Sequence, residues 1–326
     1  MQEHGQALDA PYVVEVWRGR RIESRHRVAI CAVDADDNVL LETGTVDVPV
    51  FLRSTAKPFI AAASVRAGAV DAFGFDEQDL ALMCASHAGE EGHVAIARSM
   101  LEKSSIPESA LLCGGKPSAI YNNCSGKHAG ILALCKYVGA PLETYLEPAN
   151  PAQQLILAFC ERVMDEPFPP ERIGVDGCGI PVIATSLRRT ARAFARVASL
   201  TGLEQGDADA LGRCRRAMAA YPWCVSGTGR FDTALIEASA GAIVGKGGAE
   251  AVHGSAIVPL RAGVAIKVID GSGRATAPAV LAALAEIGAL NESMAAKLVA
   301  FAEPPVRNVA GRVVGAVRAT VAARTP

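Results

Sequence analysis

The sequence predicts an α+β fold in which strands from both ends of the chain form one sheet and helices fill the middle. Residues 11–52 are rich in Val and Ile and are interrupted by short turns. Residues 54–220 carry apolar side chains at three- and four-residue spacings, and strand patterns return after residue 240. Repeated strand–helix–strand units are not visible, so we expect a mainly antiparallel sheet.

Each element follows from its local pattern. The N-terminal strands are predicted at residues 12–17, 24–33 and 39–45, with turns at 18–21 and 34–38. Helices are predicted at residues 56–67, 93–101, 127–138, 153–164, 187–201 and 209–221. Strands are predicted again at residues 241–244, 253–259 and 263–269, followed by a helix at 278–287. No repeat or low-complexity linker divides the chain, so residues 1–326 are expected to form a single domain.

Composition excludes several classes of protein. The chain has 326 residues, is 50% hydrophobic and carries a net charge of −2, which excludes disordered and fibrous classes. A nucleic-acid or membrane-surface protein needs a basic field that this chain lacks. Residues 1–10 do not read as an export signal, and no apolar run is long enough to span a bilayer. The nine cysteines are therefore expected to be reduced, in a cytoplasmic protein.

The first candidate for chemistry is the Ser-x-x-Lys pattern of Ser54 and Lys57. This spacing places both side chains on one face of a helix. Pro58 is tolerated only in the first helical positions, so Ser54 is predicted at the helix start, where free N–H groups favour an oxyanion. A neutral Lys57 could then take the hydroxyl proton. The alternative is a Ser that caps the helix beside a solvated Lys.

Four further segments combine polar side chains with glycine, and their sequences are CASHAG at 84–89, NCSGKH at 123–128, DGCGIP at 176–181 and KGGAE at 246–250. Taken singly, each has a plain structural alternative: a helix cap, a surface turn, or a buried cysteine in a tight loop. A phosphate-binding loop is excluded at residues 244–250, because the lysine is followed by Gly247 instead of Ser or Thr.

The order of these segments is more informative than any one of them. Ser-x-x-Lys on an early helix, Ser-containing loops in the helical middle and Lys-x-Gly on a late strand is the order used by serine β-lactamases and penicillin-binding proteins. This chain departs from that pattern because the late motif lacks the threonine and Ser-Asp-Asn is absent. The comparison therefore favours acyl transfer without identifying the substrate.

Together with RSTAKP at 53–58, the four segments resemble the rhizobial-type L-asparaginases over nearly the whole chain. The resemblance implies a serine β-lactamase-like fold and two Ser–Lys pairs in one pocket, Ser54 with Lys57 and Ser86 with Lys246. It also implies that Arg53, His128 and Asp176 bind substrate.

The same resemblance implies one modulatory zinc ion per chain, held by Cys124, Lys127 and Cys178 with Asp176 close by. The spacing of these residues does not itself predict zinc, because no paired Cys-x-x-Cys is present. Members of the family are homodimers, and a homodimer is the expectation here.

The sequence thus leads to one hypothesis and two alternatives. The hypothesis is hydrolysis of L-asparagine to L-aspartate and ammonia through a serine acyl-enzyme, with a lysine as the base. One alternative is a related serine amidase or esterase acting on a β-lactam or a D-amino-acid peptide. The other is a non-catalytic small-molecule or zinc-binding protein. Preference between asparagine and glutamine, and between Ser54 and Ser86 as nucleophile, stays open.

Overall fold

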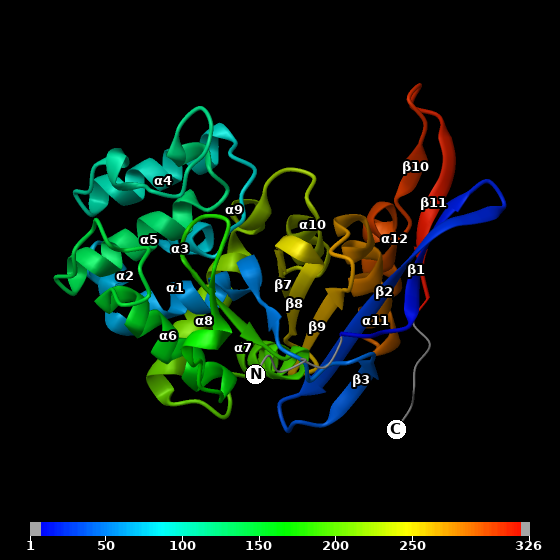
Figure 1. Cartoon of the computed structure of the whole chain (residues 1–326), viewed down its shortest axis with the longest axis horizontal. Coiled ribbons are helices and arrows are strands. Elements are labelled where there is room, and N and C mark those ends of the chain that lie inside the picture. The colour runs from blue at the N-terminus through cyan, green and yellow to red at the C-terminus, as the bar shows by residue number, and fades with distance from the viewer. Residues whose placement is uncertain (1–7, 321–326) are drawn as a thin grey trace. The chain divides into compact units, whose positions relative to one another are not determined.

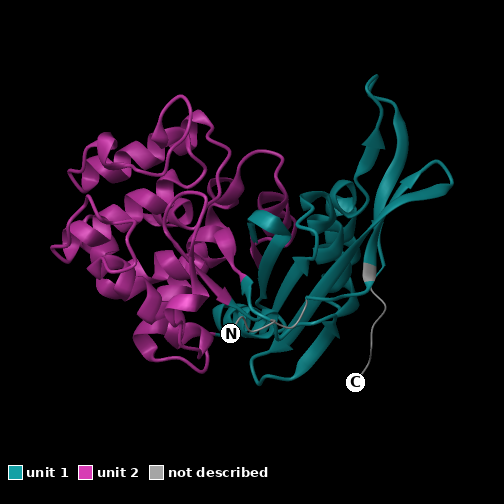
Figure 2. Ribbon diagram, in the orientation of Figure 1, with its two compact units in different colours: residues 1–50, 185–199, 247–326 teal, residues 51–184, 200–246 magenta. Residues whose placement is uncertain are grey.

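The computed structural model describes residues 8–320 and divides into two compact units (Figure 2). Unit 1 comprises residues 1–50, 185–199 and 247–326, and unit 2 comprises residues 51–184 and 200–246. Each unit is built from segments that are distant in the sequence. Within the described residues, no helix is both long and apolar enough to cross a membrane.

Unit 1 contains an antiparallel sheet with the strand order β10-β11-β1-β2-β9-β8, and β3 also pairs with β2 (Figure 1). The strands are β1 (Tyr12–Arg18), β2 (Arg21–Asp34), β3 (Val39–Thr43), β8 (Val252–Ile257), β9 (Ala262–Val268), β10 (Pro305–Arg307) and β11 (Val313–Ala319). The first half of β2 alternates between exposed and more buried residues, whereas its second half is buried on both faces. Strands from both ends of the chain therefore share one sheet, as the sequence predicts.

Helix α7 (Leu187–Ser199) packs against β2, β8 and β9 within unit 1. Ala191 and Ala195 of this helix join Ala29, Cys31 and Ala265 of the sheet in one buried cluster. The contact is so close that a Cβ added at Gly263 would lie 1.9 Å from the backbone oxygen of Ala191. Only glycine allows the helix to approach the strand at this point. Helices α11 (Thr276–Glu286) and α12 (Glu292–Ala302) complete the unit.

Unit 2 is mainly helical. Its helices are α1 (Lys57–Ala67), α2 (Ala69–Ala72), α3 (Glu77–Met83), α4 (Glu91–Lys103), α5 (Ser125–Tyr137), α6 (Pro151–Met164), α8 (Gln205–Ala220), α9 (Pro222–Ser226) and α10 (Phe231–Ala238). Helix α1 packs against α5, α6 and α8, and both α1 and α5 are buried over most of their length. The absence of a polar face on these helices reflects this central position.

Short strands interrupt the helical region. Strands β5 (Ile173–Val175) and β6 (Pro181–Thr185) form an antiparallel pair, with β4 (Val50–Phe51) on the other side of β6. They enclose the turn that carries Asp176 and Cys178. The sequence did not predict them, because three to five residues are too few for a period to emerge. The last strand of the unit, β7 (Ile243–Gly248), carries Lys246.

Candidate active site

Helix α1 begins at the Ser-x-x-Lys motif. Residues Arg53–Ala56 form a 3-10 turn that runs directly into α1, whose first two residues are Lys57 and Pro58. Proline costs no helical hydrogen bond at this position. Ser54 is half-buried on the turn. The prediction that Ser54 lies at the helix start is therefore confirmed.

The turn before α1 is held by contacts to two other segments. Arg53 has a φ of 51°, a left-handed conformation that is unfavourable for a residue with a Cβ. Its Nε donates to Oδ1 of Asp176 at 2.6 Å, so the ion pair ties this backbone to the β5–β6 turn. The fully buried Thr55 donates from Oγ1 to the backbone oxygen of Lys246 at 3.3 Å. Strain and buried polar contacts at one short turn are typical of a functional site.

The amine of Lys57 is buried and joins three segments. Nζ donates to the backbone oxygen of Ala85 at 2.5 Å and to Oγ of Ser86 at 3.0 Å, and it lies 3.5 Å from the oxygen of Asn123. Burial lowers the pKa of Lys57 to about 8, with repulsion from Lys127 and Lys246 adding to the effect and Cys124 opposing it. The neutral form of this amine is therefore accessible near neutral pH, although the ammonium form is still the major one. Among the described residues, it donates to Ser86 and not to Ser54.

The loop that carries Ser86 is fixed by its backbone and by His87. Ser86 N–H donates to Val225, and His87 N–H donates to Asn123. Gly89 N–H donates to Nδ1 of His87 at 3.1 Å, so the ring proton lies on Nε2, which donates to Oγ of Ser125 at 3.0 Å. Burial lowers the pKa of His87 to about 3, so the ring stays neutral. The loop is thereby joined to the start of α5.

Lys246 is as deeply buried as Lys57, with 1% of the residue exposed. Its Nζ lies 3.5 Å from Oδ2 of Asp232, a residue of α10 that is itself buried. Burial lowers the pKa of Lys246, and the Asp232 carboxylate opposes this shift. Asp232 was missed by the sequence analysis. An acidic residue in the first turn of a helix is common, so no local signal distinguishes Asp232.

Two thiols and an amine meet beside this region. Nζ of Lys127 lies 2.9 Å from Sγ of Cys178, and Sγ of Cys178 lies 3.5 Å from Oδ2 of Asp176. A hydrogen bond from Cys178 to Cys124 lowers the pKa of Cys124, with help from the charges of Lys57 and Lys127, and raises that of Cys178. Hydrogen bonding to Arg53 and the charge of Lys127 outweigh burial and hold the pKa of Asp176 below its usual range. The cluster therefore pairs one readily formed thiolate with a nearby amine.

His128 lies deeper than the sequence analysis expects for a pocket residue. It is fully buried, and its Nδ1 lies 2.7 Å from the hydroxyl of Tyr145, which also accepts the N–H of Leu112. Nε2 of His128 has no hydrogen-bond partner among the described residues. Burial holds the pKa of His128 well below its usual range, so the ring is neutral.

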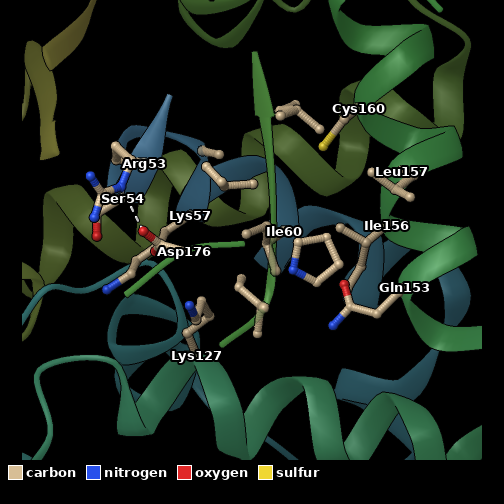
Figure 3. Close-up of a pocket in the computed structure, with 15 residues that line it drawn as sticks. Arg53, Ser54, Lys57, Ile60, Lys127, Gln153, Ile156, Leu157, Cys160 and Asp176 are labelled. Carbon is tan, nitrogen blue, oxygen red and sulfur yellow. Dashed lines mark hydrogen bonds and ion pairs between the residues drawn. The ribbon is translucent and has the colours of Figure 1, made fainter. Parts of the chain in front are cut away.

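A cavity of about 20 Å³, room for about one water molecule, lies against the motif (Figure 3). Arg53, Ser54, Lys57, Lys127 and Asp176 form its polar side. Its other lining residues include Ile60, Gln153, Ile156, Leu157 and Cys160. The structure therefore brings five of the predicted site residues around one cavity. Ser86 is connected to it through Lys57, and Lys246 through the backbone contact of Thr55.

Among residues 8–320, no group of three or more His, Cys, Asp or Glu side chains could hold a metal ion. A metal held by Cys124 and Cys178 would therefore need the amine of Lys127 as a further ligand, as the sequence resemblance implies.

Comparison with known proteins identifies one family. The family model described as L-asparaginase II matches residues 14–319. The resemblance drawn from the five motifs is thereby confirmed. No curated protein matches the chain.

Solved structures give only distant matches. The crystal structure of Mglu in its native form has 14% sequence identity to this chain and a TM-score of 0.46. The match covers 81% of this chain and 65% of the Mglu chain. Native Mglu in 4.3 M NaCl has 17% identity and a TM-score of 0.40, with coverages of 81% and 62%. A protein of Bacteroides dorei DSM 17855, provisionally assigned as a beta-lactamase, has 15% identity and a TM-score of 0.39, with coverages of 78% and 92%. The chain thus spans less than two thirds of the Mglu chains, and no argument rests on these three likenesses.

Proposed function

The chain belongs to the L-asparaginase II family, whose members are amidohydrolases, and we propose that it hydrolyses L-asparagine to L-aspartate and ammonia through a serine acyl-enzyme. One observation carries the proposal: the amine of Lys57 is buried, has a pKa of about 8 and lies one turn after a serine that faces a cavity. A hydroxyl becomes an effective nucleophile only when a nearby base takes its proton. We further propose that the fold is of the serine β-lactamase type.

In the first step, Ser54 Oγ attacks the side-chain amide carbon and its proton passes to neutral Lys57. The backbone N–H groups of Thr55 and Lys57 donate to Leu52 and Ser54, so the negative charge that develops on the amide oxygen is stabilised by the positive end of the α1 helix dipole. Since Lys57 donates to Ser86, it must turn from Ser86 toward Ser54 or exchange the proton through Ser86. The second route places Ser86 in the proton path.

In the second step, the carbon–nitrogen bond breaks and ammonia leaves with a proton supplied through Ser86 and Lys246. A water molecule then attacks the ester carbon while the amine of Lys57 takes one of its protons. The bond between this carbon and Ser54 Oγ breaks, and Lys57 returns the proton to Ser54 as L-aspartate leaves. The cavity beside Ser54 has room for such a water.

Substrate binding is assigned to Arg53, Asp176 and His128. L-Asparagine carries a carboxylate and an ammonium group, and the ion pair of Arg53 and Asp176 offers one partner for each. The orphaned Nε2–H of His128 is a donor that a ligand could satisfy after a small movement.

We also propose that Cys124, Lys127 and Cys178 hold one zinc ion. Two sulfurs and a nitrogen fit the preferences of zinc, and the proton shared by the two thiols marks a site that favours a cation. Bound zinc would hold these three side chains together beside Asp176 and so modulate substrate binding.

We further propose that the protein is a cytoplasmic homodimer. Light scattering should then give a molar mass of twice 33.8 kDa.

The decisive experiment measures ammonia release from asparagine and glutamine, together with ring opening of a chromogenic β-lactam, which releases no ammonia and is followed by its absorbance. Ser54→Ala should abolish turnover of asparagine while the melting temperature is retained. Ser64→Ala is the matched control, because Ser64 is a buried serine of α1 whose hydroxyl has no hydrogen-bond partner among the described residues. Wild-type turnover in Ser54→Ala would contradict the assignment. Turnover of the β-lactam in place of asparagine would favour the related amidase.

A further inference from the structure

The two buried lysines of the site have chemically different partners. Lys57 donates to two backbone carbonyls and to the hydroxyl of Ser86, and the thiol of Cys124 is a further hydrogen-bond partner. Lys246 instead lies 3.5 Å from the carboxylate of Asp232. The side chains of Lys246 and Asp232 are only 1% and 9% exposed, so water screens this pair little.

The position of Asp232 does not by itself require this contact. Asp232 occupies the first turn of α10, where an acidic side chain is favoured by the helix dipole even when it points into water. Here the residue is buried, and its Oδ2 points to an amine that comes from β7. A buried carboxylate is retained only when it is paired or hydrogen-bonded.

We propose that Asp232 is a positioning residue that keeps Lys246 as an ammonium ion, so that Lys57 accepts the proton in the reaction and Lys246 supplies it. This inference rests on the proposed function, which assigns the base to Lys57 and the supply of the proton to Lys246. It adds to that function the residue that holds the proton on Lys246.

The groups that face Lys246 support this division. They include Asp232 from α10, Cys84 after α3, Cys124 before α5 and Lys57 from α1. Among them, Lys57 repels a second cation. Asp232 is the carboxylate in this set.

The division of roles balances the protons of the first half-reaction. Lys57 takes the proton of the Ser54 hydroxyl as the carbon–oxygen bond forms. When the carbon–nitrogen bond breaks, its electron pair stays on nitrogen, which takes one proton from the Lys246 ammonium through the Ser86 hydroxyl. Ammonia leaves neutral, and the proton held by Lys57 returns through Ser86 to Lys246. No proton is gained or lost overall.

The test compares the pH dependence of kcat/KM for asparagine in the wild type, Asp232→Asn and Asp232→Glu. Without the carboxylate, Lys246 loses its proton at lower pH. We therefore expect the alkaline limb of the kcat/KM profile of Asp232→Asn to move to lower pH by about one unit or more. The variant should lose more activity at pH 9 than at pH 7. Asp232→Glu should return the limb toward that of the wild type.

A matched control is Asp79→Asn, which removes another buried carboxylate that contacts a lysine, Lys103, in the same unit. It should lower the melting temperature without moving the alkaline limb. A loss of activity in Asp232→Asn that is equal at every pH, with the limb unmoved, would overturn the proposal and leave Asp232 a purely structural role.

A second measurement does not depend on activity. The chain has eight lysines, so the side-chain carbon next to each amine can be followed by NMR after 13C labelling, with Lys246→Arg to assign the signal. The titration of Lys246 should move to lower pH in Asp232→Asn. An unchanged titration would overturn the proposal. If the wild type released no ammonia, the proposed function would fail, while this titration would still decide whether Asp232 holds the proton on Lys246.

Discussion

At the scale of single residues, the site depends on an amine that can lose its proton. Lys57 is one of three buried lysines in the region, with Lys127 and Lys246. Burial and repulsion between these amines make the neutral form of Lys57 accessible. Lysine suits this role because its proton affinity responds to burial, whereas the guanidinium of arginine stays charged.

Replacement of Lys57 by Arg tests this requirement. The variant keeps the positive charge but cannot act as a base, so kcat should fall by about 10²–10⁴-fold. Lys136→Arg is the control, because Lys136 also donates to two backbone carbonyls, those of Ser104 and Ser105, but has no part in the mechanism. Steady-state ammonia release measures both. Retained turnover in Lys57→Arg would exclude Lys57 as the base.

The sequence predicted some residues of the site and missed others for a physical reason. Ser54 and Lys57 are one turn apart, so their spacing alone places them together. Asp232 and Lys246 are brought together by the fold, and nothing local marks Asp232. His128 follows Lys127 directly in the sequence, yet its side chain bonds to Tyr145 and does not line the cavity beside Ser54.

At the scale of elements, the site depends on the close packing of α3 and α5. A Cβ at Gly126 would lie 2.5 Å from Cγ and 2.6 Å from the backbone oxygen of Leu82. Helix α5 carries Lys127, and Cys124 stands at its N-terminal cap. A shift of this helix would therefore move two of the proposed zinc ligands.

Two glycine substitutions separate packing from helix propensity. Alanine favours a helix by about 1 kcal/mol over glycine, but Gly126→Ala must displace the backbone of α3, with a cost of about 1–3 kcal/mol or more. Gly130→Ala meets only the flexible side chain of Met83, so it should cost less. Thermal unfolding measures both. Equal melting temperatures would contradict this packing argument.

Metal removal tests the link between α5 and the β5–β6 turn. Cys124 and Lys127 belong to one segment and Cys178 to the other, so bound zinc would cross-link segments more than 50 residues apart. A chelator should lower the melting temperature of zinc-loaded protein, since a ligand that binds only the folded state stabilises it. Cys178→Ser should bind less than one zinc per chain and respond little to the chelator. Equal metal content in the two proteins would exclude the site.

At the scale of the whole molecule, stability should depend on buried neutral histidines. Burial lowers the pKa of His87 to about 3 and also lowers that of His93, which stacks on His87 and Trp223. In the unfolded chain, a histidine takes up its proton near pH 6.5. Between these values the unfolded state binds more protons, so stability falls as the pH falls.

The free energy of unfolding should therefore decrease below pH 6.5, by up to about 1.4 kcal/mol per pH unit for each such histidine. His87→Gln can keep the contacts to Gly89 and Ser125 without a titrating ring, and it should show a weaker dependence between pH 6.5 and 4. Urea unfolding at several pH values measures this. An identical slope in the two proteins would show that His87 does not carry the effect.

The sequence by itself determined the classes of element, the antiparallel sheet shared by both chain ends, and the family. These follow from periodicity, turn residues and ordered motifs, which are local properties of the chain. Only the tertiary structure decided which amine meets which hydroxyl or carboxylate. Lys57 lies beside Ser86, Lys246 beside Asp232 and Arg53 beside Asp176. Such contacts depend on how buried helices and short strands pack, and the spacing of side chains along the sequence does not predict that packing.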